Sequence, residues 1–167
     1  MNAGVRREEA GFRNVPKRSV VTGATGFAGR RLVEMLIERG AEKVVAFDVA
    51  PPASDAVDDP RITYVQGDIT KPDDVLAACR DVDCCFHLAA LVGPYYTARA
   101  FEEVNYRGTI HVLDACKKNK IPKLVMSSSP STRFPFPDPS VRGLGENELE
   151  ELNGPGKYSS VLQSAVV

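Results

Sequence analysis

Three glycines between an apolar run and a helical pattern constrain this chain more than any other feature. The stretch reads VVTGATGFAGRRLVEMLIERG, from Val20 to Gly40, with Gly23, Gly26 and Gly29 at its turn. β-Branched residues precede the glycines, and apolar residues at helical spacing follow them. We therefore expect a strand, a tight turn and a helix that ends at Gly40.

This turn predicts a site for a phosphate-bearing ligand. Gly23 permits the tight turn, Gly26 lets a pyrophosphate approach the backbone, and Gly29 lets the helix pack close to the strand. The helix N-terminus adds free N–H groups and a partial positive charge. The spacing is Gly-x-x-Gly-x-x-Gly and not G-x-G-x-x-G, so the glycines alone also fit a turn that is merely tight.

Asp48 strengthens the nucleotide interpretation. It lies at the end of the second expected strand, where a carboxylate can accept hydrogen bonds from both hydroxyls of an adenosine ribose. A 2′-phosphate would meet this negative charge, and no arginine directly follows Asp48. We therefore expect NAD as the cofactor in preference to NADP. The structural alternative is a solvated aspartate that ends a strand.

Strands and helices alternate along the chain, which is typical of βαβ units and a parallel sheet. The strands are expected at residues 18–23, 43–49, 62–68, 82–90 and 123–129. The helices are expected at residues 26–40, 70–80 and 96–119, with Thr70 capping the second. The predicted fold is α/β, a doubly wound parallel sheet of the Rossmann type.

Length and composition predict one domain. A chain of 167 residues with 43% apolar residues has room for one proper core. Residues 1–17 are expected to be disordered, and residues 18–167 to form an NAD(P)-binding domain whose regular pattern is lost after about residue 130.

Charge and apolar runs exclude two classes of partner. The net charge is −1 and the basic residues are scattered, so the chain has no basic stripe for nucleic acid. No stretch reaches the roughly 18 apolar residues that a membrane span needs. We expect a cytoplasmic protein, or one on the cytosolic face of an endomembrane if a longer native chain carries an anchor.

The cysteines and histidines do not predict a metal site. No C-x-x-C pair and no ligand cluster with a histidine is present among Cys79, Cys84, Cys85 and Cys116. We expect buried free thiols. His87 in a buried strand and His111 in a helix are expected to be core or surface residues.

Several motifs in order carry a resemblance to a known family. They are TGATGFAGRRLVEMLIERG, VQGDIT, DVDCCFHLAA and VNYRGTIHVLDACKKNKIPKLVMSSS, between Arg18 and Ser129. Together they resemble the extended short-chain dehydrogenase/reductases, in the 3β-hydroxysteroid dehydrogenase/isomerase-like branch. The resemblance covers the N-terminal NAD-binding part of that family. It implies an NAD-dependent oxidoreductase that interconverts a secondary alcohol and a ketone on a sterol-like substrate.

The resemblance also implies roles for residues of the cofactor site. The pyrophosphate would be wrapped by Gly23, Thr25, Gly26, Phe27, Ala28 and Gly29. Asp48 would hold the adenosine ribose, and Asp68 and Ile69 would flank the adenine. Ala89 and Ala90 would pass beneath the cofactor, and Leu91 or Val92 would begin the substrate-side loop.

Catalytic roles follow from the same resemblance. Asn105 matches the family's helix asparagine, which supports an active-site water relay. Ser129 would hydrogen-bond the substrate oxygen, and Tyr158 would transfer the proton. The family has a Tyr-x-x-x-Lys motif, whereas this chain has Leu162 at the lysine position. A neutral leucine cannot stabilise a tyrosinate.

Two further functions stay open at the level of the sequence. Leu162 fits a non-catalytic NAD-binding module, and the N-terminal motifs also fit a nucleotide-sugar epimerase or dehydratase. Relative to the family, the chain is expected to be truncated before the sixth strand and the substrate domain. An open sheet edge would favour self-association. The resemblance implies a homodimer through the helices around Asn105 and Tyr158.

Overall fold

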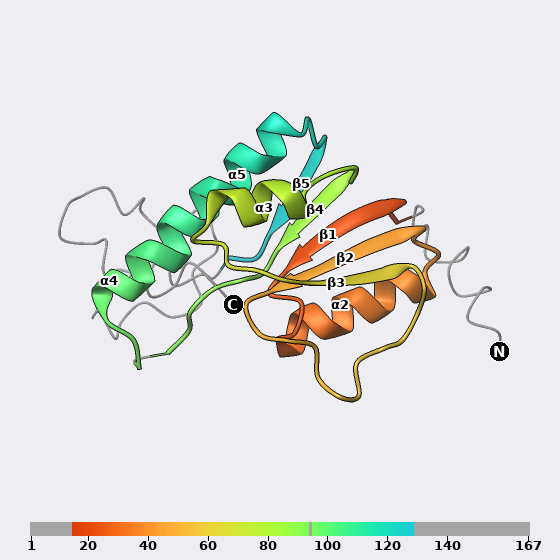
Figure 1. Ribbon diagram of the computed structural model, residues 1–167, viewed down its shortest axis with the longest axis horizontal. Helices are drawn as coiled ribbons and strands as arrows, with labels where there is room; N and C mark the ends of the chain where they lie inside the picture. The colour runs from red at the N-terminus through yellow and green to blue at the C-terminus, as the bar shows by residue number, and fades with distance from the viewer. Residues whose placement is uncertain (1–14, 94, 129–167) are drawn as a thin grey trace, which may run out of the picture.

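The computed structural model describes residues 15–93 and 95–128, which form one parallel sheet with helices on both faces (Figure 1). The strands are β1 Arg18–Thr22, β2 Lys43–Asp48, β3 Ile62–Gln66, β4 Cys84–His87 and β5 Lys123–Met126. Their order in the sheet is β3-β2-β1-β4-β5, and all four pairings are parallel. The predicted Rossmann fold is confirmed. Its strand order reverses between β1 and β4, where such sheets bind ligands.

The helices follow the strands in the alternation that the sequence predicts. They are α2 Phe27–Glu38, α3 Pro72–Ala78, α4 Ala98–Phe101, η1 Glu102–Gly108 and α5 Thr109–Lys118. The last three form one continuous helix whose middle segment, η1, has the wider π-helical turn. The expected long helix at 96–119 is therefore confirmed, with a local widening that side-chain periodicity does not reveal.

The core has two halves, one on each face of the sheet. On one face, α2 packs Val33, Leu36 and Ile37 against Val21 of β1 and Val44 of β2. On the other face, α3 and α5 cover the sheet, as Figure 1 shows above the strands. The residues buried there include Val20, Phe47, Val75, Cys85 and Val112. Alternating strand residues thus serve opposite faces, as the period of two requires.

One local expectation needs correction. Thr70 does not cap α3: the N-cap is Lys71, without a side-chain cap, and the Thr70 N–H instead donates to Asp68 Oδ1 over 2.8 Å. Pro72 occupies the first turn and supplies the helix start without a cap.

Candidate functional site

A cavity of about 390 Å³ lies at the carboxyl ends of the strands. Of the residues predicted to bind a cofactor, eight line it: Gly23, Thr25, Gly26, Asp48, Asp68, Ile69, Ala89 and Ala90. They come from the ends of β1, β2, β3 and β4, so segments far apart in the chain meet at the point where the strand order reverses. Sequence reasoning missed Phe47, Gly67, Leu88 and Val104, which also line the cavity.

The glycine turn is pressed against the end of β4. Gly23 has a φ of +71°, and a Cβ added there would lie 2.7 Å from the backbone nitrogen of Ala89. A Cβ on Gly29 would collide with the carbonyl oxygen of Gly23, whereas one on Gly26 would meet only that same oxygen, at 3.3 Å. Gly23 and Gly29 are therefore required by packing, and Gly26 keeps the turn open toward a ligand.

The N-terminus of α2 is open to an anion. Its N-cap is Gly26, which gives no side-chain cap, and its first turn contains no acidic residue. The first N–H that bonds within the helix is that of Arg30, to the Gly26 carbonyl over 2.9 Å. The preceding N–H groups have no intrahelical partner, as at every helix start, and a phosphate is their preferred ligand.

Phe27 and Ala28 do not present their side chains to the cavity. Phe27 is 99% exposed and Ala28 is also exposed. Gly29 is buried beneath the turn, outside the cavity lining. Phe27 and Ala28 would therefore contact a cofactor through their backbone N–H groups. Gly29 would act indirectly, because its lack of a side chain lets the helix pack against the turn.

Asp48 ties the glycine turn to the end of β2. Its Oδ2 accepts from the Thr25 N–H over 2.9 Å, and its Oδ1 accepts from the Ala50 N–H over 3.1 Å. These bonds fix the carboxylate on the wall of the cavity and leave it further lone pairs for a ligand hydroxyl. The Asp48 carboxylate is therefore held in place for the predicted contact with an adenosine ribose.

Asp68 and Ile69 form another wall. The Asp68 N–H donates to Asp74 Oδ2 over 3.1 Å, which orders the turn before α3. Ile69 is only 5% exposed, and a Cβ on Gly108 would lie 2.7 Å from its Cδ1. The helix containing η1 thus approaches this wall closely because position 108 has no side chain.

Asn105 lies beside the cavity lining, not in it. It is 2% exposed, its Oδ1 accepts from the Leu91 N–H over 2.8 Å, and its Nδ2 donates to the Leu91 carbonyl over 3.0 Å. This paired contact fixes the backbone of Leu91, which does line the cavity. The π-helical turn of η1 contains Asn105, as such turns often contain residues at functional sites.

His87 is a core histidine, as expected. It is 3% exposed, and burial lowers the pKa of its imidazole to about 4. Its Nδ1 lies 2.7 Å from the Thr22 hydroxyl oxygen, on the neighbouring strand position of β1. The imidazole is therefore neutral at physiological pH.

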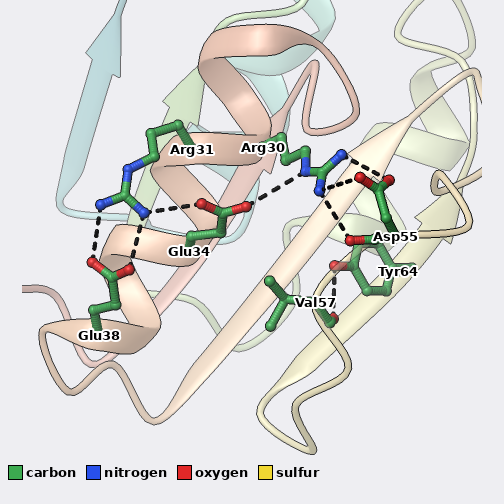
Figure 2. A network of polar contacts seen from close by, with 7 residues as sticks. All are labelled: Arg30, Arg31, Glu34, Glu38, Asp55, Val57 and Tyr64. Carbon is green, nitrogen blue, oxygen red and sulfur yellow. Dashed lines mark hydrogen bonds and ion pairs between the residues drawn. The ribbon is translucent and has the colours of Figure 1, made fainter.

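A surface network holds the loop that follows β2 (Figure 2). The Arg30 guanidinium donates to both carboxylate oxygens of Asp55 over 2.9 Å and reaches Glu34 at 3.5 Å. Arg30 also holds the pKa of Asp55 below its usual range. The Tyr64 hydroxyl donates to the Val57 carbonyl over 2.9 Å. The loop is thereby tied to α2 and to β3, beside the Asp48 carboxylate.

Three thiols meet in the core, which the sequence spacing did not reveal. The Sγ atoms of Cys79, Cys85 and Cys116 lie within 4.8 Å of one another, and none of the three lines the cavity. Hydrogen bonding to Cys116 raises the pKa of Cys79 to about 12 and also raises that of Cys85. The four cysteines are free and buried, as expected.

The predicted catalytic residues Ser129 and Tyr158 lie outside the described residues. The described chain extends to Ser128, and the N–H of Ser127 donates to the His87 carbonyl over 3.2 Å. The end of β5 therefore lies beside the end of β4. Within residues 15–93 and 95–128, no helix has the length and apolar character to span a membrane.

Comparison with known sequences points to one protein family. Residues 20–164 match the model of the 3-beta hydroxysteroid dehydrogenase/isomerase family. The human sterol-4-alpha-carboxylate 3-dehydrogenase, decarboxylating, is 34% identical over 121 residues, which cover 72% of this chain and 31% of the relative. The 2-alkyl-3-oxoalkanoate reductase of Stenotrophomonas maltophilia is 35% identical over 131 residues, covering 78% and 38%. The chain thus spans about a third of the length of these relatives.

A solved structure supports the fold. The UDP-glucose 4-epimerase of Thermus thermophilus, determined as a complex with NAD, has a TM-score of 0.68 and 25% sequence identity. The match covers 87% of this chain and 48% of the epimerase. The match to the family model extends over residues 20–164, which is most of the chain, and the chain therefore belongs to the 3-beta hydroxysteroid dehydrogenase/isomerase family.

Proposed function

We propose that the chain is the NAD-binding part of an oxidoreductase that interconverts a secondary alcohol and a ketone on a sterol-like ring. The observation that carries this proposal is the Asp48 carboxylate, held at the end of β2 on the wall of a cavity that also contains the glycine turn. A pyrophosphate fits the uncapped start of α2, and an adenosine ribose fits Asp48. Membership of the family supports the chemistry.

Two features favour NAD over NADP. A 2′-phosphate on the ribose would meet the negative charge of Asp48. Arg30, which directly follows the glycine turn, is engaged by Asp55 and Glu34 and is not held toward the ribose position. Replacing Asp48 with Asn removes the charge, and we expect the preference for NAD over NADP to fall at least about tenfold.

When bound, NAD⁺ would supply the hydride acceptor, carbon 4 of its nicotinamide. The alcohol carbon loses a hydride, its hydroxyl loses a proton, and the carbon–oxygen bond becomes a carbonyl. Ser129 would hydrogen-bond that oxygen and Tyr158 would accept the proton, by analogy with the family. Leu162 provides no positive charge to lower the pKa of the Tyr158 phenol, so we expect slow turnover.

The relatives' names narrow the proposed substrate. One name describes oxidation at carbon 3 of a sterol whose carbon 4 carries a carboxylate. The other describes reduction of a 3-oxo acid with an alkyl group on carbon 2. In both, the reacting carbon is next to the carbon that carries the carboxylate. We therefore extend the proposal to a branched 3-hydroxy or 3-oxo carboxylate on an apolar body.

A substrate panel tests this function. The chain is incubated with NAD⁺ and a 3β-hydroxysterol 4-carboxylate, a 3β-hydroxysteroid without the carboxylate, or UDP-glucose, and NADH and sugar products are measured. We expect NADH with the hydroxy acid, at a higher rate in the Leu162→Lys variant. Conversion of UDP-glucose alone would favour the nucleotide-sugar alternative, for which the epimerase likeness is the supporting observation.

The non-catalytic alternative gives a different result. A module that only binds NAD would give no product with any member of the panel, and Leu162→Lys would leave the rate at zero. That outcome, in a chain that binds NAD, would overturn the proposed oxidoreductase.

A further inference from the structure

A chain of buried and partly buried hydrogen bonds connects the two ends of the backbone segment Leu88–Leu91. At one end, the Thr22 hydroxyl oxygen accepts from the Ala89 N–H over 3.2 Å. It also accepts, over 3.2 Å, from the Leu88 N–H, which is shared with the Thr22 carbonyl oxygen at the same distance. At the other end, the Asn105 side chain bonds the Leu91 backbone. All four residues of Leu88–Leu91 line the cavity.

His87 lies between these two ends. Its Nδ1 is 2.7 Å from the Thr22 hydroxyl oxygen, and its Nε2 is 3.0 Å from the Thr109 hydroxyl oxygen. The Thr109 hydroxyl in turn donates to the Asn105 carbonyl over 2.6 Å. One imidazole thus joins β1 to the helix formed by η1 and α5.

The donors and acceptors allow one direction of hydrogen bonding along this chain. The Asn105 carbonyl can only accept, so the Thr109 hydrogen is donated to it and the Thr109 oxygen is left as the acceptor for His87 Nε2. At the other end the Thr22 oxygen accepts the Ala89 N–H and the shared Leu88 N–H, and its own hydrogen is donated to His87 Nδ1. The imidazole hydrogen is then on Nε2 and is donated to Thr109. Thr109 keeps its own hydrogen for the Asn105 carbonyl, so the direction is consistent at every step.

We propose that His87 is a positioning residue. In its Nε2–H form it links Thr22 to Thr109 and thereby holds the backbone of Leu88–Leu91 in the position in the cavity wall that cofactor binding requires. His87 itself does not line the cavity. It acts through Thr22 on the first two residues of the segment, and through Thr109 and Asn105 on the last. The inference rests on the proposed function, because the cofactor is the ligand whose contact the segment would serve.

Protonation of His87 would break this arrangement. A hydrogen on Nδ1 would bring a third N–H to the Thr22 oxygen and displace the Thr22 hydroxyl hydrogen from its acceptor. The low pKa that burial gives the imidazole keeps this state scarce at physiological pH. The segment is therefore held by a neutral histidine that is almost sealed from solvent.

Variants of the two threonines test the positioning role in the 167-residue chain. Thr22→Val and Thr109→Val each remove one link while keeping a branched side chain, and we expect each to weaken NAD binding about tenfold by calorimetry. Thr22→Ser and Thr109→Ser keep the hydroxyl and should bind NAD within about twofold of the unmodified chain.

Ser19→Ala is the matched control. Ser19 is also a fully buried hydroxyl on β1, and its Oγ has no hydrogen-bond partner among the described residues. Its removal should leave NAD affinity unchanged. Thermal unfolding of every variant separates a loss of affinity from a loss of folded protein. Valine variants that fold and bind NAD as tightly as the unmodified chain would overturn the positioning role.

Nitrogen NMR of the unmodified chain tests the direction of hydrogen bonding without any substitution. The ring shifts of His87 should show the hydrogen on Nε2 and an accepting Nδ1. A hydrogen on Nδ1 would overturn the inference, even if the valine variants do not fold. This measurement needs no cofactor, so failure of the proposed function, seen as no NAD binding by the unmodified chain, is distinguishable from failure of the inference.

Discussion

Gly26 and Gly29 belong to the same turn, yet an added methyl group would meet different surroundings at the two positions. At Gly29 it would collide with the carbonyl oxygen of Gly23, whereas at Gly26 it would meet only that oxygen, at 3.3 Å. Gly29→Ala should therefore lower the free energy of unfolding by about 1–3 kcal/mol, the usual cost of overpacking.

Gly26→Ala should separate binding from folding. Its φ of −69° suits alanine, so the free energy of unfolding should change by less than about 1 kcal/mol. A methyl group between the turn and a pyrophosphate should nevertheless weaken NAD binding at least about tenfold. Urea unfolding and calorimetry give the two quantities, and unchanged NAD affinity in Gly26→Ala would contradict the location of the pyrophosphate.

At the residue scale, sequence patterns predicted the cavity residues that lie at strand ends. They did not predict the residues that reach the cavity from within a strand or helix, or the contacts that hold its wall in place. Asp48 and Ala89 follow directly from strand ends and family motifs. Phe47 and Val104 were missed because an apolar residue in a strand or helix reads as core, whether or not one side of it faces a cavity. The Leu91 contact of Asn105 was missed because it joins a loop to a helix turn, which spacing does not encode.

At the scale of elements, the contact of His87 in β4 with Thr22 in β1 predicts that the free energy of unfolding depends on pH. The His87 pKa falls from 6.5 to about 4 on folding, so the unfolded chain binds more protons in that interval. The stability that neutral His87 supports is complete above pH 6.5 and is lost as the pH falls toward 4. A shift of this size corresponds to about 3 kcal/mol.

Urea unfolding as a function of pH measures this effect. The unmodified chain should lose stability between pH 6.5 and 4, and His87→Gln, which cannot titrate there, should lose much less in that interval. Asp59, whose pKa Arg61 lowers from 3.8 to about 2, stabilises the fold above pH 3.8 and loses that contribution only as the pH falls from 3.8 toward 2, below the interval in which His87 titrates. Equal slopes for the two proteins between pH 6.5 and 4 would contradict the assignment to His87.

The ion pair between Arg30 of α2 and Asp55 of the loop after β2 predicts how a substitution would change the preference between NAD and NADP. Arg30 and Thr25 border the same small pocket, and the Thr25 N–H bonds Asp48, so Arg30 lies near the ribose side of the site. Asp55→Ala frees much of the Arg30 guanidinium for a 2′-phosphate. We expect the affinity for NADP to rise severalfold and that for NAD to stay constant.

Glu38→Ala is the control for this prediction. It releases a second arginine of α2, Arg31, which is paired with Glu34 and Glu38 farther along the helix, as Figure 2 shows. Calorimetric titration with NADP should detect no gain in this variant. An equal gain in both variants would reflect the change in net charge and not the position of Arg30.

At the scale of the whole molecule, one helix carries an exposed apolar stripe. Tyr106, Ile110 and Leu113 are 58%, 40% and 41% exposed and recur at helical spacing along η1 and α5. The family resemblance implies a homodimer through the helix around Asn105, and this stripe offers an apolar surface for it. We expect the double variant Ile110→Lys, Leu113→Asp to be monomeric in sedimentation experiments, and Lys118→Glu on the same helix to remain dimeric.

A dimer that persists in the double variant would contradict this interface. The edge of the described sheet would then be the better candidate, because Val125 and Met126 of β5 are about half exposed.

The fold as a whole was more predictable than its polar connections. Short continuous apolar runs that alternate with helices of period 3.6 predict a parallel sheet, and the order β3-β2-β1-β4-β5 is the usual one for this alternation. The cluster of Cys79, Cys85 and Cys116 could not be foreseen, because its members come from the end of α3, from β4 and from α5 and meet only through packing. The same holds for the contact between His87 and Thr109.

Calorimetric titration of the folded chain with NAD tests the central claim most directly. Circular dichroism first establishes that the 167-residue chain is folded. We predict saturable binding of NAD, with weaker binding of NADP and a reduced preference in Asp48→Asn. A folded chain that gives no heat of binding with NAD would contradict a cofactor site at the glycine turn and Asp48.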